Sequence, residues 1–137
     1  MRIIIALMGI CSIALFAVIS FVGDVTPVET ARVRSPDGRV DAVVTTSSAG
    51  GAAGSVVTWV FLVPAGAPIT SDDNFLVSAT HVEPALSITW SQDRVIEISY
   101  NRATISIFSD RWIDRRSSST SPYEVELRLR ANVVKAS

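Results

Sequence analysis

The chain has 137 residues, with 12 Lys and Arg against 13 Asp and Glu, which gives a formal net charge of −1. This balance argues against a nucleic-acid partner, which would favour a concentrated basic surface. A single Cys and a single His exclude an internal disulfide. They also leave too few ligands for a structural zinc site, which takes about four N or S atoms.

The N-terminal segment is the most apolar part of the chain. Residues 3–22 carry no charge, and their only polar side chains are Ser12 and Ser20. As a helix rising ~1.5 Å per residue, this run would span ~30 Å, the thickness of the hydrocarbon core of a bilayer. Because Arg2 precedes the run and Asp24 follows it, we expect a single-pass membrane anchor whose N-terminus is cytoplasmic.

A cleaved secretory signal is the alternative interpretation of this segment. The best cleavage position follows Ser20, with Val18 two residues earlier. The apolar run is, however, longer than the roughly 7–15 residues that a signal needs. Under either interpretation residues 24–137 lie outside the cytoplasm, and they fold without disulfides because the only cysteine is Cys11.

The first expected strands lie on either side of a turn. Residues 32–34 and 40–44 flank Ser35-Pro-Asp-Gly38, where the proline, the aspartate and the glycine predict a turn. Residues 56–63 are apolar on both faces, which predicts a central strand covered on two sides. Pro64 should end this strand, because proline cannot serve a central ladder.

The next elements alternate between apolar and polar side chains with the period of two that is typical of strands. Residues 86–90 and 96–100 alternate in this way around turn-forming residues at 91–94, which predicts a hairpin. Further strands are expected at 75–82 and at 103–108.

The clearest alternation comes last. Over residues 123–131 the apolar side chains fall on one face and the charged ones on the other, as in a strand with one buried and one solvated face. The preceding stretch, 111–122, is rich in serine and should be an exposed loop. Four residues on the apolar faces of their strands are expected to share one core: Trp59, Trp90, Ile98 and Leu127.

Together these elements predict an all-β fold, a compact antiparallel sandwich or barrel that follows a single N-terminal transmembrane helix. The expected boundaries are 1–23 for the membrane anchor or signal segment, 24–29 for a linker and 30–137 for the antiparallel β-domain.

Several of these features occur in one recognisable order. An N-terminal apolar segment is followed by the Ser-Pro-Asp-Gly turn at 35–38, a glycine-rich stretch before an apolar strand, and a hairpin from Trp90 to Tyr100. Over residues 30–108 the chain resembles small bacterial envelope proteins with a Ser-Pro-Asp-Gly β-domain. The resemblance implies a bacterial origin and no particular activity.

Candidate catalytic residues are few. His81 could form a triad with a serine and Asp72 or Asp73, but no Gly-x-Ser-x-Gly elbow accompanies it. Residues 50–55 are glycine-rich but lack the lysine and the following helix of a phosphate loop, so we expect a hairpin loop there. We therefore expect no catalytic residues, no cofactor and no metal.

One local cluster combines basic and aromatic side chains. Arg111, Arg115 and Arg116 surround Trp112 and could bind an acidic partner, a glycan or lipid head groups, with the indole at an interface. A solvated loop is the alternative interpretation, because acidic neighbours dilute the charge.

These observations favour a non-enzymatic, membrane-tethered extracytoplasmic β-domain that acts by protein or surface contact and whose residues 3–22 lie in the membrane. Two alternatives are an exported hydrolase that uses His81 with a serine and an aspartate, and a signal-cleaved, secreted binding module.

Overall fold

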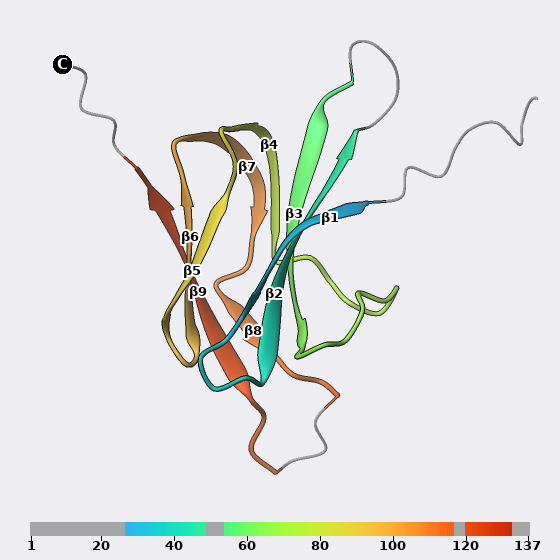
Figure 1. The fold of residues 1–137 in the computed structure, drawn as a ribbon, viewed down its shortest axis with the longest axis vertical. Helices are drawn as coiled ribbons and strands as arrows, with labels where there is room; N and C mark the ends of the chain where they lie inside the picture. Colours follow the sequence, from blue (N-terminus) through green and yellow to red (C-terminus); the bar gives the residue numbers. More distant parts are fainter. Residues whose placement is uncertain (1–26, 49–53, 117–119, 133–137) are drawn as a thin grey trace, which may run out of the picture.

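The computed structural model of the chain describes residues 27–48, 54–116 and 120–132, which fold into strands without a helix (Figure 1). In chain order the strands are β1 (Val28–Arg34), β2 (Val40–Ser48), β3 (Val56–Pro64), β4 (Val77–Glu83), β5 (Ser87–Gln92), β6 (Val95–Tyr100), β7 (Arg102–Phe108), β8 (Arg111–Ile113) and β9 (Glu124–Ala131). No helix long and apolar enough to cross a membrane occurs among these residues. The expected transmembrane segment at 3–22 lies outside them.

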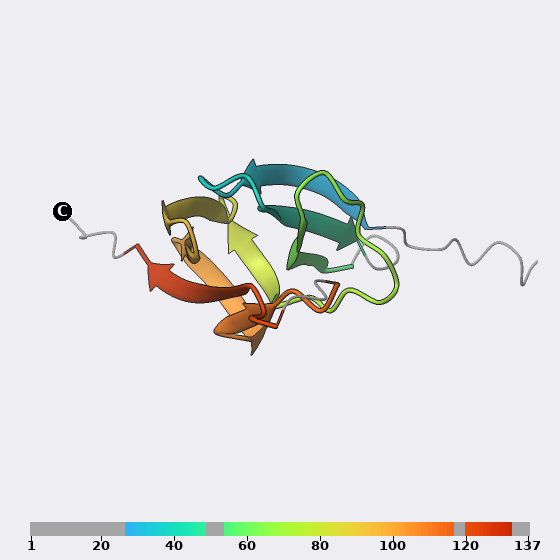
Figure 2. The same ribbon diagram turned by 90° about the horizontal axis from the view of Figure 1, so that it is seen from below.

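The strands form two sheets that face each other, as Figure 2 shows. One sheet has the order β1-β2-β3-β4-β7, and the other has the order β5-β6-β9-β8. The prediction of an all-β fold is thus confirmed. Strand β3 occupies the centre of the larger sheet, as its apolar faces predict, while β1 begins at Val28, inside the range expected to be a linker.

Both predicted hairpins form. In the turn between β1 and β2, the Ser35 N–H donates to the Val40 carbonyl (2.8 Å) and the Gly38 N–H donates to the Ser35 carbonyl (2.9 Å). Gly38 has φ of 72°, a conformation that glycine adopts without a steric penalty. Strands β5 and β6 pair antiparallel around residues 93–94, so turn chemistry correctly located both connections.

The expectation of a purely antiparallel fold is wrong for one pair. Strand β9 lies parallel to β6, with Val95 opposite Glu126 and Tyr100 opposite Ala131. After β6 the chain crosses to the larger sheet as β7 and returns through β8 before it enters β9. Because of this crossover, β9 runs in the same direction as β6 when the two strands pair. The other pairs among the described strands are antiparallel.

The expected loop at 111–122 begins with a strand rather than a loop. Residues Arg111–Ile113 form β8, in which Trp112 lies opposite Val125 of β9. Trp112 is half-buried and packs against the core, while its neighbours on either side are exposed. The burial of this one indole explains why a short charged segment adopts strand geometry.

The core lies between the two sheets and combines alternate residues of the inner strands. Its buried members are Val40, Ala42, Val44, Val60, Leu62, Leu76, Val77, Ile96, Ile98, Tyr123, Val125 and Leu127, with Trp90 packed against them. The predicted shared core is therefore confirmed for Trp90, Ile98 and Leu127. It is wrong for Trp59, because the period of two places Trp59 on the face of β3 opposite to Val60 and Leu62.

The outer face of β2 and β3 is covered by the connection between β3 and β4, residues 65–76 (Figure 1). Phe75 from this connection contacts the rings of Trp59 (6.4 Å between centroids) and Phe61 (6.3 Å). The Leu76 N–H donates to the Val60 carbonyl (2.8 Å). This covering segment, called the 65–76 loop below, explains why β3 is buried on both faces.

Replacing Leu127 by alanine should lower the free energy of unfolding by ~2–5 kcal/mol, because it removes a buried side chain and leaves a cavity. The matched control is Arg128→Ala, which removes an exposed ion pair with Glu126 and should change the stability by less than about 1 kcal/mol. Urea unfolding of the full chain in a mild detergent, followed by tryptophan fluorescence, measures both. Equal effects of the two substitutions would contradict the assigned alternation of β9.

Candidate functional site

An open pocket of about 580 Å³ lies between the 65–76 loop and the segment around β8. Its lining residues are Asp72, Asp73, Asn74, Phe75, Leu76, Ser109, Arg111, Trp112, Ile113, Asp114, Arg115 and Arg116. All four residues of the predicted basic-aromatic cluster are among them. The structure also brings Asp72 and Asp73, which the sequence suggested as partners of His81, to the same pocket.

An ion pair joins the two walls of this pocket. Arg116 donates from Nη2 to both carboxylate oxygens of Asp73 (2.7 and 2.6 Å) and lies 3.3 Å from the Thr70 hydroxyl. The same carboxylate accepts hydrogen bonds from the Thr70 N–H (2.8 Å) and hydroxyl (3.0 Å). Because the Asp73 side chain is only 13 % exposed, this bridge is partly shielded from water and fixes the loops relative to each other.

Strand β8 orients the remaining wall. Alternation along it turns Trp112 toward the core and the flanking Arg111 outward, where Arg111 pairs with Glu124 of β9 (2.7 Å). Beyond the strand, the Asp114 carboxylate accepts a hydrogen bond from the Arg116 N–H (2.9 Å). This short turn directs the side chain of Arg116 toward Asp73.

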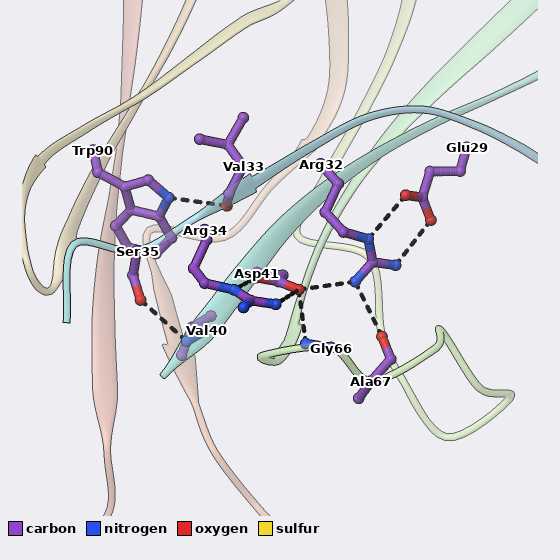
Figure 3. Close-up of polar contacts among 10 residues, drawn as sticks. All are labelled: Glu29, Arg32, Val33, Arg34, Ser35, Val40, Asp41, Gly66, Ala67 and Trp90. Carbon is purple, nitrogen blue, oxygen red and sulfur yellow. Dashed lines mark hydrogen bonds and ion pairs between the residues drawn. The ribbon is translucent and has the colours of Figure 1, made fainter. Parts of the chain in front are cut away.

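The position of the 65–76 loop depends on a buried carboxylate. Asp41 lies in β2, is 1 % exposed, and accepts hydrogen bonds from Arg34 Nε (2.9 Å), Arg32 Nη1 (3.1 Å) and the Gly66 N–H (2.8 Å), as Figure 3 shows. Arg32 also donates to the Ala67 carbonyl (3.1 Å). These contacts, called the Asp41 cluster below, attach the beginning of the loop to β1 and β2.

The electrostatics of the Asp41 cluster favour the ionised carboxylate. The hydrogen bond from Arg34, together with those from Gly66 and Arg32, outweighs the effect of burial and lowers the pKa of Asp41 to about 2. Glu29 extends the cluster through two hydrogen bonds with Arg32, both 2.8 Å long. The sequence analysis did not identify this cluster, although Arg34 and Asp41 both belong to the strands that flank the predicted turn and lie opposite each other in the hairpin.

A second polar cluster lies at the same end of the sandwich as the Asp41 cluster. It joins the β1–β2 turn, the β5–β6 turn and the segment before β9. Tyr123, the residue before β9, is buried between the guanidinium groups of Arg39 (4.4 Å from the ring centroid) and Arg94 (4.5 Å). Its hydroxyl donates to the Asp37 carboxylate and lies 3.3 Å from the Asp93 carbonyl oxygen. Burial, with the neighbouring Asp37, raises the pKa of Tyr123 to about 12.

The proposed histidine triad is not assembled among the described residues. His81 is exposed, has φ of 54°, and its Nδ1 lies 3.2 Å from the hydroxyl of Thr80. It stands toward the end of β4, whereas Asp73 precedes that strand and pairs with Arg116. Within the described ranges no cluster of three or more His, Cys, Asp or Glu side chains could hold a metal ion. Most of the glycine-rich stretch at 50–55 lies outside these ranges.

Comparison of the chain with protein-family models, with curated proteins and with solved structures finds no match.

The Asp41 cluster predicts a specific pH dependence. Because the pKa of Asp41 falls from 3.8 to about 2 on folding, its ionised form stabilises the fold by about 2 kcal/mol above about pH 5. This stabilisation is lost as the pH falls toward 2. The variant Asp41→Asn should accordingly be less stable than the wild type at pH 7, and the difference should shrink by more than half near pH 2.

Chemical unfolding of both proteins across this pH range measures the difference directly. A matched control is Asp110→Asn, at an exposed position, which should leave the pH dependence unchanged. A difference between wild type and Asp41→Asn that is the same at both ends of the range would contradict the assigned ionisation.

Proposed function

We propose that this protein is a membrane-tethered, extracytoplasmic β-sandwich domain that acts by binding a surface or partner rather than by catalysis. The single observation that carries the binding role is the pocket between the 65–76 loop and β8. Two segments distant in sequence are held around it by the Arg116–Asp73 ion pair. Exposed loops positioned by a rigid sheet are a common location for binding residues.

The tether is supported by the apolar run at 3–22 and by the short distance from it to the domain. Val28 already pairs with Thr46 in the larger sheet, so only residues 23–27 separate the run from β1. At most ~3.6 Å per residue, this connection keeps the domain near the membrane surface. A domain held so close to a membrane is suited to contacts with other components of that surface.

A non-catalytic role is supported by how the polar groups of the pocket are engaged. The Asp73 carboxylate is paired with the Arg116 guanidinium, an arrangement that suits a structural role more than proton transfer. The lone histidine, His81, makes its hydrogen bond to Thr80, and no contact described here links it to a serine. A nucleophile held by a base is what acyl-transfer chemistry needs.

Cell fractionation tests this proposal. When the full chain with a C-terminal tag is expressed in a bacterium, it should sediment with membranes, resist extraction by alkaline carbonate, and be degraded by protease added from the extracytoplasmic side. Deleting residues 3–22 should leave the tagged protein in the soluble cytoplasmic fraction.

Two outcomes would contradict the tether. A soluble periplasmic or secreted product beginning at Phe21 would establish the signal-cleaved alternative instead. Full-length protein in the cytosol would overturn the proposed location altogether.

A further inference from the structure

The pocket carries no net charge, although charged groups dominate its polar lining. Three carboxylates and three guanidinium groups line it, namely those of Asp72, Asp73, Asp114, Arg111, Arg115 and Arg116. Opposite charges in one small site largely cancel at the distance of an approaching ligand. A strongly anionic ligand would meet Asp72 and a cationic one would meet Arg115, so the lining disfavours both.

Within the same lining, some donors and acceptors are engaged and others are not. Arg116 and Asp73 pair with each other, and Arg111 pairs with Glu124. In contrast, the described residues provide no hydrogen-bond partner for Arg115 or Asp72. The pocket thus offers a guanidinium donor and a carboxylate acceptor for a ligand that can both accept and donate hydrogen bonds.

Aromatic surface completes the pocket. Phe75 is 38 % exposed, and its ring is held by contacts with Trp59 and Phe61. Trp112 is half-buried and anchored against the core. Because both rings are fixed by packing, little side-chain entropy is lost when a ligand covers them.

From this combination we propose that the pocket binds a carbohydrate without net charge. Sugar hydroxyls donate and accept at once, which matches Arg115 and Asp72 together, and the C–H face of a sugar ring packs on an aromatic ring. The volume of about 580 Å³ falls within the ~300–1,000 Å³ typical of small-molecule pockets, which leaves room for a mono- or disaccharide unit. This inference rests on the proposed binding function and specifies its ligand class.

The test uses the full chain in phosphatidylcholine nanodiscs, which contain no sugar. The protein is applied to an array of neutral, sialylated and sulfated glycans, and the best neutral binder is then titrated by calorimetry. Arg115→Ala and Asp72→Ala should each weaken binding about tenfold, because each removes a charged hydrogen-bonding group. Both positions are exposed, so the melting temperature should be unchanged.

Matched controls lie at the other end of β4. Arg102 and Glu83 form an exposed pair there, and Arg102→Ala and Glu83→Ala should bind the same glycan within about twofold of the wild type. Asp72→Ala should in addition raise the relative affinity for acidic glycans, because it removes the carboxylate that repels them.

Three results of the glycan experiments would overturn the ligand assignment. They are the absence of glycan binding, binding confined to acidic glycans, and neutral-glycan binding that survives the double substitution Arg115→Ala, Asp72→Ala. Binding to vesicles of phosphatidylglycerol in place of glycans would assign the site to anionic lipid and would also overturn it. A membrane-located chain that fails these binding tests would leave the tether standing, so the two proposals fail separately.

Discussion

The buried carboxylate of Asp41 is the interaction on which the pocket end of the molecule depends. A charge inside a sheet is costly unless paired, and removing its partners typically costs several kcal/mol. Here Arg32 and Arg34 come from the neighbouring strand β1, but the Gly66 N–H comes from the 65–76 loop. The Gly66 N–H can reach the carboxylate only when the loop folds back over the sheet, so this hydrogen bond couples the loop to Asp41.

The hydrogen bond between Gly66 and Asp41 also affects the position of the rest of the 65–76 loop. Once its beginning is attached at Gly66, its far end brings Phe75 against Trp59 and Asp73 within reach of Arg116. The loop is then held at its beginning by the Gly66–Asp41 hydrogen bond, and at its far end by the aromatic contact of Phe75 and the ion pair of Asp73. A change at Asp41 should thus affect a pocket to which Asp41 itself contributes no side chain.

At the same end of the molecule as the Asp41 cluster, the two sheets are joined by contacts of the Tyr123 ring with two arginine side chains. Tyr123 is clamped between Arg39, from the β1–β2 turn, and Arg94, from the β5–β6 turn. Cation–π contacts of this kind contribute about 0.5–2 kcal/mol each. On the side of β5, the Trp90 indole N–H donates to the Val33 carbonyl (3.1 Å, Figure 3) and links the edge strands of the two sheets.

Sequence reasoning succeeded where the signal is local. Alternation of side chains predicted every strand except β8, and turn residues such as those at 35–38 located both hairpins, because period and turn chemistry are properties of neighbouring residues. It failed where the outcome depends on distant segments: the parallel pairing of β6 with β9, and the face on which Trp59 is covered. The pairing of Arg34 with Asp41 could have been predicted from the hairpin, because the two residues lie opposite each other in it. The Arg116–Asp73 ion pair could not have been predicted, because no local sequence pattern connects residues that are 43 positions apart.

Amide hydrogen exchange, resolved residue by residue in the full chain, tests the central claim that Asp41 holds the 65–76 loop. In the wild type the amides of Gly66 and Leu76 should be protected, because they donate to Asp41 and to Val60. In Asp41→Asn both should exchange roughly tenfold faster or more, while the Ile98 amide in the smaller sheet stays protected. Unchanged protection of Gly66 and Leu76 in this variant would contradict the account.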